Sequence, residues 1–149
     1  MAKIETYNLA SSPISGADKL IGTDSANNND TKNFSVQEVS DFVKPYKVYV
    51  ALLNQSGTDD PTAIVLENTL GANIVWTYNG VGQYTGTLSG AFTSNKTVCF
   101  ATLGNWNTFV TNVALERTDN NSVSLLAFLP NDNTYNDFTN LSVEIRVYQ

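Results

Sequence analysis

The sequence predicts a mainly β protein: an N-terminal extended segment with a β-hairpin and a short helix, followed by an antiparallel β-sandwich or jelly-roll-like domain. Three observations predict this fold class. From Tyr46 onward, apolar and polar residues alternate with a period of two in about eight short runs, with turn-forming residues between them. Only 15% of the 149 residues are charged, and Asn, Thr and Ser replace the Lys and Glu that favour helices. No repeat of fixed period is present, which argues against a propeller or a solenoid.

The hairpin is predicted in the stretch KLIGTDSANNNDTKNFSV, residues 19–36. A short apolar piece, Leu20-Ile21, comes first, and an Asn-rich run, Ser25–Asp30, follows it. Asn and Asp side chains bond to nearby backbone groups and so favour turns. Residues Thr31–Val36 then alternate between polar and apolar. This order predicts two short strands joined by a polar tip.

A helix of about two turns is predicted directly after the hairpin. Ser35 and Glu38 have the spacing of a capping box, and Pro45 ends the helical pattern. A helix of this length is not stable alone, so its apolar face is expected to dock on another surface. That face consists of Val36, Val39, Phe42 and Val43.

The period of the apolar residues changes at Lys44-Pro45, which predicts two parts. Residues 1–45 are expected to form an assembly or anchoring segment, and residues 46–149 the β-sandwich domain. In the domain, the first run, YKVYVALLN, places Val48, Val50 and Leu52 on one face. The last run, LSVEIRVY, points its apolar residues inward, from Leu141 to Val147. The runs between them are AIVLENT, NIVWTY, QYTGTLS, KTVCFATL, TFVTNVALE and VSLLAFL, and the NGVG at 79–82 predicts a hairpin turn.

Composition argues against several classes of protein. The formal net charge is −6 and the sequence pI is about 4.3, so the chain repels nucleic acid and anionic lipid, and neither is expected as a partner. The N-terminus lacks the pattern of a signal peptide, and no apolar run reaches the length of a membrane span. One cysteine allows no intramolecular disulfide. Folding in a reducing cytoplasm is therefore expected.

Catalytic chemistry has little support in the sequence. Histidine is absent, which removes His-based triads and most zinc sites, and Cys99 in the apolar run TVCFAT is expected to be a buried thiol. Two carboxylate pairs, Asp59 with Asp60 and Asp132 with Asp137, lie in loop-like sequence, where turn formation is favoured over a hydrolase site. No catalytic residue and no cofactor are assigned.

A calcium loop starting at Asp24 fails on spacing, because Ala26, Asn29 and Ser35 occupy positions that need oxygen ligands, Gly and Glu. A structural cation at Asp119 or Asp132 stays open as an alternative, and no metal ligand is assigned. Four aromatic residues have a possible binding role. Two readings compete for them, a sugar-stacking platform and burial in the core or in subunit contacts. The four are Trp76, Tyr78, Trp106 and Tyr135.

One stretch of about thirty residues, ISGADKLIGTDSANNNDTKNFSVQEVSDFV, resembles a recurrent N-terminal segment of tailed-bacteriophage virion proteins. Its pattern is a short Leu-x-Gly-Thr-Asp strand, a polar turn, a Thr-Lys-Asn-Phe-Ser-Val strand and a short helix, here Leu20–Asp24, Thr31–Val36 and Val39–Val43. The following run from KVYVALLN to SNKTV is similar to domains in phage structural proteins, including those of phages that infect Bacteroidetes. The two resemblances together span residues 14–98.

The resemblance implies a non-enzymatic virion protein of the head-fibre, tail-fibre or decoration type. It implies a homo-oligomer, often a trimer, with its N-terminus toward the particle and with capsid, portal or tail proteins as partners. The protein would be made in the cytoplasm of the host bacterium and located in the virion. A carbohydrate-binding or host-receptor-binding module, with a host surface glycan as ligand, is the alternative. The residues expected to assemble or anchor the protein are Leu20, Ile21, Phe34, Val36, Val39 and Phe42.

Overall fold

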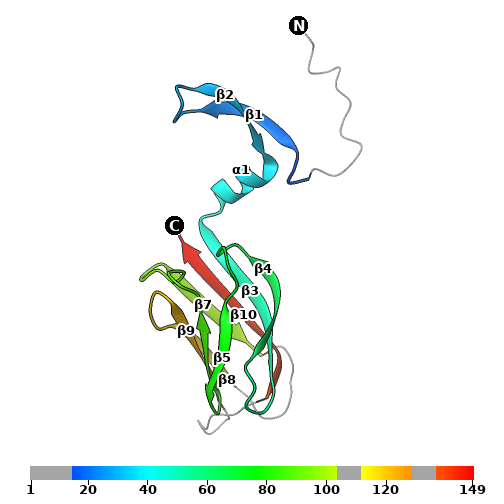
Figure 1. The fold of residues 1–149 in the computed structure, drawn as a ribbon, viewed down its shortest axis with the longest axis vertical. Coiled ribbons are helices and arrows are strands. Elements are labelled where there is room, and N and C mark those ends of the chain that lie inside the picture. The colour runs from blue at the N-terminus through cyan, green and yellow to red at the C-terminus, as the bar shows by residue number, and fades with distance from the viewer. Residues whose placement is uncertain (1–14, 104–111, 129–136) are drawn as a thin grey trace. The chain divides into compact units, whose positions relative to one another are not determined.

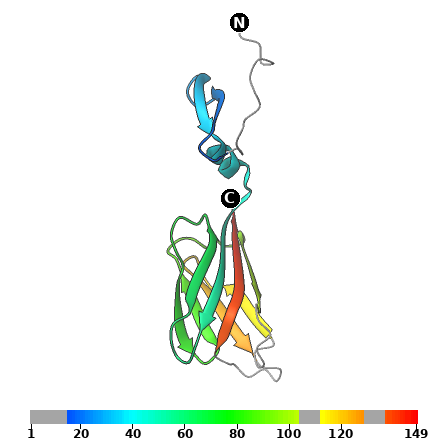
Figure 2. The same cartoon turned by 90° about the vertical axis from the view of Figure 1, so that its right-hand side faces the viewer.

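A computed structural model of the chain describes residues 15–103, 112–128 and 137–149. The chain divides into two compact units, Met1–Pro45 and Tyr46–Gln149 (Figures 1 and 2). The division falls at the proline where the period of the apolar residues changes. Each unit is described by itself below.

The described part of the first unit begins with an antiparallel hairpin. Strand β1 (Lys19–Asp24) pairs with β2 (Asp30–Ser35), so that Leu20 stands opposite Phe34. The carboxylate of Asp24 accepts hydrogen bonds from the backbone N–H of Ala26 and from the side chains of Asn27 and Lys32, which holds the turn in place. Asn28 and Asn29 follow with φ of 52° and 59°, in the left-handed region that Asn tolerates better than most residues.

Helix α1 (Val36–Val43) follows β2 without a break. The predicted capping box is confirmed: Oγ of Ser35 accepts from the backbone N–H of Glu38 at 3.1 Å, and the Glu38 carboxylate accepts from the backbone N–H of Ser35 at 2.6 Å. The helix ends at Lys44, whose extended backbone is the conformation that a following proline requires.

The second unit is a sandwich of two four-stranded sheets. The β10 sheet has the order β4-β3-β10-β7, and the β9 sheet has the order β5-β6-β9-β8. Every described strand pair is antiparallel, which confirms the predicted fold class. β7 and β8 lie close together where the two sheets meet. The strands are β3 (Tyr46–Gln55), β4 (Thr62–Asn68), β5 (Val75–Gly80), β6 (Gln83–Thr87), β7 (Thr97–Thr102), β8 (Asn112–Arg117), β9 (Ser122–Phe128) and β10 (Phe138–Tyr148).

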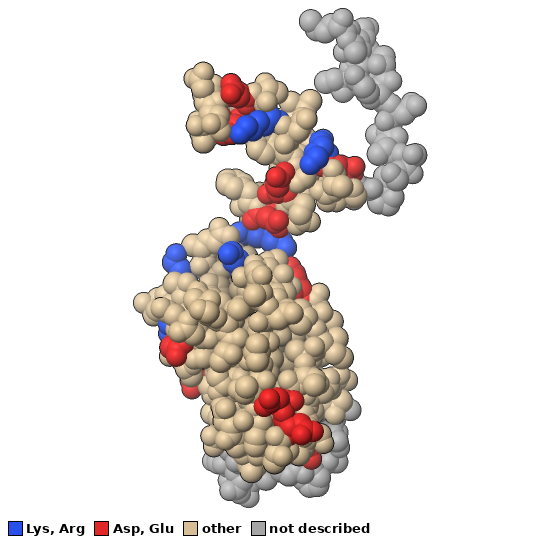
Figure 3. Space-filling view, viewed as in Figure 1, with Lys and Arg blue, Asp and Glu red and all other residues tan. Residues whose placement is uncertain are grey.

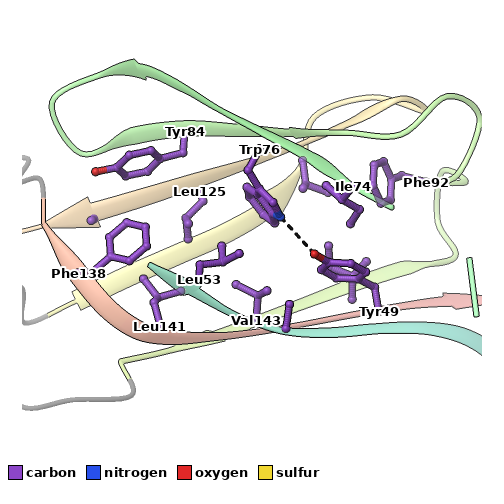
Figure 4. Close-up of a cluster of buried hydrophobic side chains, with 14 of the residues drawn as sticks. Tyr49, Leu53, Ile74, Trp76, Tyr84, Phe92, Leu125, Phe138, Leu141 and Val143 are labelled. Atoms are coloured by element: carbon purple, nitrogen blue, oxygen red, sulfur yellow. Dashed lines mark hydrogen bonds between the residues drawn. The ribbon is translucent and has the colours of Figure 1, made fainter. Parts of the chain in front are cut away.

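The hydrophobic core fills the space between the two sheets (Figure 4). On β10, the predicted inward residues from Leu141 to Val147 are buried, as expected. On β3, the inward residues are Tyr49, Ala51 and Leu53, so the face that Val48, Val50 and Leu52 share points away from this core. Opposite them lie Ile74, Trp76, Tyr84, Phe92, Val123, Leu125 and Ala127.

Gly86 on β6 shows how closely the core is packed. A Cβ atom at this position would lie 2.9 Å from Cγ2 of Ile74 and 3.0 Å from Cζ3 of Trp76. The absence of a side chain at Gly86 therefore lets the indole ring lie close to the strand. The Trp76 indole N–H donates to the hydroxyl of Tyr49, 3.4 Å away, which connects the two sheets (Figure 4).

Candidate assembly surface

The described part of the N-terminal unit has no interior of its own. Every residue from 15 to 45 is exposed or only half-buried. The most exposed apolar side chains are those of Phe42 (87%), Ile21 (80%) and Val43 (67%), and Leu20 and Val39 are also exposed. Large apolar groups at these exposures are unusual for a surface that stays in water. We call this set the assembly surface.

The helix contributes three neighbouring apolar side chains to the assembly surface. Val39, Phe42 and Val43 stand at positions i, i+3 and i+4, so they lie on one face of α1. Val43 was not among the predicted assembly residues, although it has the same helical spacing as the other two. The sequence placed Val43 on the apolar helix face with Val39 and Phe42, and this helical spacing was the signal that could have added it to the list.

The hairpin residues do not form one surface. Leu20 and Phe34 are directly opposite each other and share a face, whereas Ile21 lies opposite Asn33 on the other face. The ring of Phe34 covers Gly22, where an added Cβ would come within 3.0 Å of the ring. Phe34 is therefore half-buried within the hairpin itself, as is Val36 at the start of the helix. Both faces of the hairpin present apolar side chains.

The polar side of α1 is acidic. Glu38 and Asp41 lie on the helix, and no basic residue is present in its last turn. The pKa of Glu38 is lowered, first by the hydrogen bond from the backbone N–H of Ser35 and then by the Ser35 hydroxyl. Nε2 of Gln37 donates to the Asp41 carboxylate at 2.8 Å. A partner of the assembly surface therefore meets an apolar strip beside negative charge.

Of the two readings for Trp76, the structure favours burial in the core over sugar stacking. Its side chain is 4% exposed and belongs to the core between the sheets, so no sugar ring can reach its face (Figure 4). Tyr78 is half-buried against the same core, with its ring 5.9 Å from that of Tyr84 in an edge-on arrangement. Trp106 and Tyr135 lie outside the described residues.

Two of the clefts on the described part of the sandwich unit are large enough to consider as binding sites. The larger, of about 420 Å³, is lined by residues that include Lys47, Lys96 and Tyr148. The smaller, of about 260 Å³, includes Asp59 and Phe138 in its lining. Each has one aromatic residue in its lining, so neither brings together the rings that a sugar-stacking platform needs.

Two carboxylates of the predicted loop pairs accept hydrogen bonds from backbone N–H groups. Oδ1 of Asp60 accepts from the backbone N–H of Tyr78 at 2.7 Å, and the Asp137 carboxylate accepts from the backbone N–H of Gly57. Asp132 lies outside the described residues. Both hydrogen bonds reach backbone 18 and 80 residues away in the sequence, so Asp60 and Asp137 connect distant segments instead of forming the local turns that the sequence predicts.

Cys99 is half-buried on β7, and burial, together with the nearby charge of Glu116, raises the pKa of its thiol to about 11. The thiol is protonated at neutral pH and is a poor nucleophile. Asp119, a possible cation ligand in the sequence, accepts from the backbone N–H of Asn121 at 2.6 Å, which lowers its pKa. Over the described ranges, no three His, Cys, Asp or Glu side chains gather as a metal-binding group.

No helix in the described ranges has the length and apolar character that crossing a membrane requires. Comparison of the chain with protein-family models, with curated proteins and with solved structures found no match.

Proposed function

We propose that the chain is a non-enzymatic structural protein of a bacteriophage virion. It acts as a head-fibre, tail-fibre or decoration component and forms a homo-oligomer, with a trimer as the expected state. The N-terminal unit assembles the copies or anchors them to the particle, and the sandwich unit is the exterior module. The resemblance of residues 14–98 to phage structural proteins supports this proposal.

The lack of a buried interior in the N-terminal unit is the observation that carries the proposal. A two-stranded hairpin and a two-turn helix are each marginal in water without a surface to pack on. Covering one exposed Phe, Ile or Val side chain contributes about 1.5–3 kcal/mol. The largest contributions are expected from the most exposed side chains, which are those of Phe42, Ile21 and Val43. Packing against another chain supplies the apolar contacts that the unit does not supply to itself.

The direct test is to look for the chain in purified phage particles by mass spectrometry and to locate it by labelling with specific antibody. Recombinant protein is then added to particles that lack it. Phe42→Asp places a charge at the most exposed apolar side chain of the assembly surface and should abolish incorporation. Asn28→Asp is the matched control, because it adds the same charge to the exposed hairpin tip at a position where Asp tolerates the positive φ.

Absence of the chain from purified particles would contradict the virion role. Normal incorporation of the Phe42→Asp variant would contradict the anchoring role of the assembly surface. A loss of incorporation with Asn28→Asp as well would show that added charge alone is responsible, and it too would contradict the specific role of Phe42.

A further inference from the structure

The outward side of the β10 sheet carries many apolar residues among its polar ones. Residues directly opposite each other in an antiparallel sheet share a face, and alternate residues along a strand share it too. Three outward rows cross the sheet in the order β4, β3, β10, β7. The first row contains Ile64, Leu52, Ser142 and Thr102, and the second contains Glu67, Val50, Glu144 and Phe100. The third row begins at β3 and contains Val48, Arg146 and Val98. We call the apolar members of these rows the outer apolar face: Val48, Val50, Leu52, Ile64, Val98 and Phe100.

Several of these side chains remain in contact with water in the isolated chain. Ile64 is 54% exposed, Phe100 47% and Val98 40%, and the neighbouring Leu66 on the edge strand β4 is also exposed. An antiparallel sheet that faces solvent normally carries polar residues at its outward positions. The outer apolar face breaks that pattern across three of its four strands.

The other sheet of the same sandwich provides the comparison. Outward positions on the two middle strands of the β9 sheet are mostly polar: Thr85 lies opposite Ser124 and Thr87 opposite Ser122, and the third pair is Gln83 with Leu126. Both sheets cover the same core, so the core does not require an apolar outer face. The difference between the two outer faces points to a contact on one of them.

The charges on the outer apolar face are arranged to cancel. Nε of Arg146 donates to a carboxylate oxygen of Glu144 at 2.5 Å. The guanidinium group of Arg146 also lies 5.0 Å from the ring centre of Tyr46 and 5.4 Å from that of Phe100, in cation–π contact with both. The ion pair is thus held flat among apolar groups.

This arrangement favours a second copy of the chain as the occupant. The chain carries a net charge of −6, so two copies repel each other over most approaches. On this face, Arg146 and Glu144 neutralise each other, and Glu67 is the one other charged residue in the three rows. Figure 3 shows that charged side chains form only small groups on the visible side of the sandwich unit. A strongly basic partner would find no acidic patch on these rows.

The size of the face decides how strong this contact can be. Four strands about 4.8 Å apart and about five residues long at ~3.3 Å per residue give roughly 300 Å² of flat sheet surface. A stable interface buries about 800 Å² on each partner. The outer apolar face alone is therefore too small for a stable pair, and it needs a second contact between the same copies.

We infer that the outer apolar face packs against the sandwich unit of another copy in the homo-oligomer, as a second contact beside that of the assembly surface. The inference rests on the proposed function in one respect, that the chain is a homo-oligomer. It adds which side of the sandwich turns toward the neighbouring copy.

The first experiment measures the mass of the full-length oligomer by light scattering. Ile64→Asp should shift the protein toward the 16.2 kDa protomer at concentrations where the wild type stays assembled. Val75→Asp is the matched control, because Val75 is 60% exposed and occupies the edge strand of the other sheet. It should leave the mass unchanged. An unchanged mass for Ile64→Asp, or a monomeric wild type, would overturn the inference.

A second measurement avoids the chance that a buried charge simply unfolds the protein. In a Cys99→Ala background, Ile64→Cys and Val75→Cys place single thiols on the two outer faces. The thiol at position 64 should react with a maleimide more slowly than the thiol at position 75 by about tenfold or more, which corresponds to about 1.4 kcal/mol of protection. The difference should vanish in urea. Equal native rates would overturn the inference.

The two proposals fail in different ways. If Phe42→Asp lowers the mass of the oligomer and Ile64→Asp does not, the result contradicts the proposed sheet contact. The same result supports the proposed role of the assembly surface. If the chain is absent from particles but the thiol at position 64 still reacts slowly, the result contradicts the virion role. It supports the sheet contact.

Discussion

The hydroxyl group of Tyr84 donates a hydrogen bond of 3.0 Å to Oε1 of Gln55 inside the sandwich unit. The same oxygen accepts from the backbone N–H of Asp137 at 2.8 Å, and Nε2 of Gln55 donates to the carbonyl oxygens of Gly57 and Asp59. Gln55 is 6% exposed. Its side chain therefore connects the end of β3, the loop after it, the residue before β10 and strand β6.

Replacing Gln55 should lower the free energy of unfolding more than replacing Tyr84. Gln55→Leu removes the four hydrogen bonds of this side chain, which lowers the free energy of unfolding by roughly 2–6 kcal/mol, from about 0.5–1.5 kcal/mol for each bond lost. Tyr84→Phe removes one donor and costs about 0.5–1.5 kcal/mol. Urea unfolding followed by tryptophan fluorescence measures both. Equal losses, or a stabilised Gln55→Leu variant, would contradict the proposed ranking.

The sandwich unit should lose stability at alkaline pH. Burial raises the pKa values of Tyr49 and Tyr84 above their ordinary value of 10.0. Below about pH 10 both phenols keep their protons in the folded and unfolded states. Above it, the unfolded state ionises first, so the free energy of unfolding falls by up to about 1.4 kcal/mol per pH unit for each tyrosine.

Urea midpoints measured between pH 9 and pH 12 test this expectation. Tyr84→Phe should make the decline with pH shallower. Tyr148→Phe is the control, because Tyr148 is exposed and should leave the decline unchanged. A decline of equal steepness in all three proteins would show that other groups control alkaline stability.

Gly86→Ala should destabilise the sandwich unit by about 1–3 kcal/mol, the usual cost of overpacking a close-packed core. The reason is the approach of the new methyl group to Ile74 and Trp76, at 2.9 and 3.0 Å. Gly80→Ala is the matched control, since no atom lies within 4 Å of an added Cβ there. Thermal unfolding by circular dichroism compares the two variants with the wild type. The packing argument fails if both variants behave alike.

Asp24 should titrate far below an ordinary aspartate. Its pKa is lowered from 3.8 to about 2, first by the hydrogen bond from Lys32 and then by the one from Asn27. Because the folded pKa is depressed, the contribution of Asp24 to hairpin stability is present above about pH 4 and is lost as the pH falls through about 2. NMR titration of the Asp24 carboxyl carbon measures the value directly.

The same titration separates the causes. Lys32→Ala should raise the pKa of Asp24 toward 3.8, whereas Lys19→Ala, at the opposite end of the hairpin, should leave it unchanged. A value that does not move in Lys32→Ala would assign the lowered pKa to the Asn27 side chain and the turn backbone instead of the lysine.

Local features were the easiest to predict from the sequence. The capping box depends on Ser35 and Glu38 alone, three residues apart, and it forms as the spacing predicts. The inward residues of β10 were also predicted, because polar residues separate them. On β3 the pattern was ambiguous, since both faces are apolar: alternation groups Val48 with Val50 but gives no reason to prefer Tyr49 and Ala51 for the core.

Features that depend on distant residues were not predictable. The sequence around Trp76 looks the same whether the indole stacks on a sugar or fills a core. Its contacts with Gly86 and Tyr49 in the structure show that it belongs to the core. The outer apolar face depends on strand order, because Ile64, Val50 and Phe100 come together only when β4, β3, β10 and β7 lie side by side in that sequence. Strand order is set by the packing of the whole unit, not by any one run.

The central position of β10 bears on how the protein is made. β10 follows every other described strand in the sequence, yet it pairs with both β3 and β7 in the middle of its sheet. During synthesis, β3 and β7 therefore leave the ribosome before β10, the strand with which both of them pair. Such long-range pairing makes folding slow relative to helical proteins. Until β10 has emerged, β3 and β7 each expose an open strand edge, so the β10 sheet forms only after this last described strand is available.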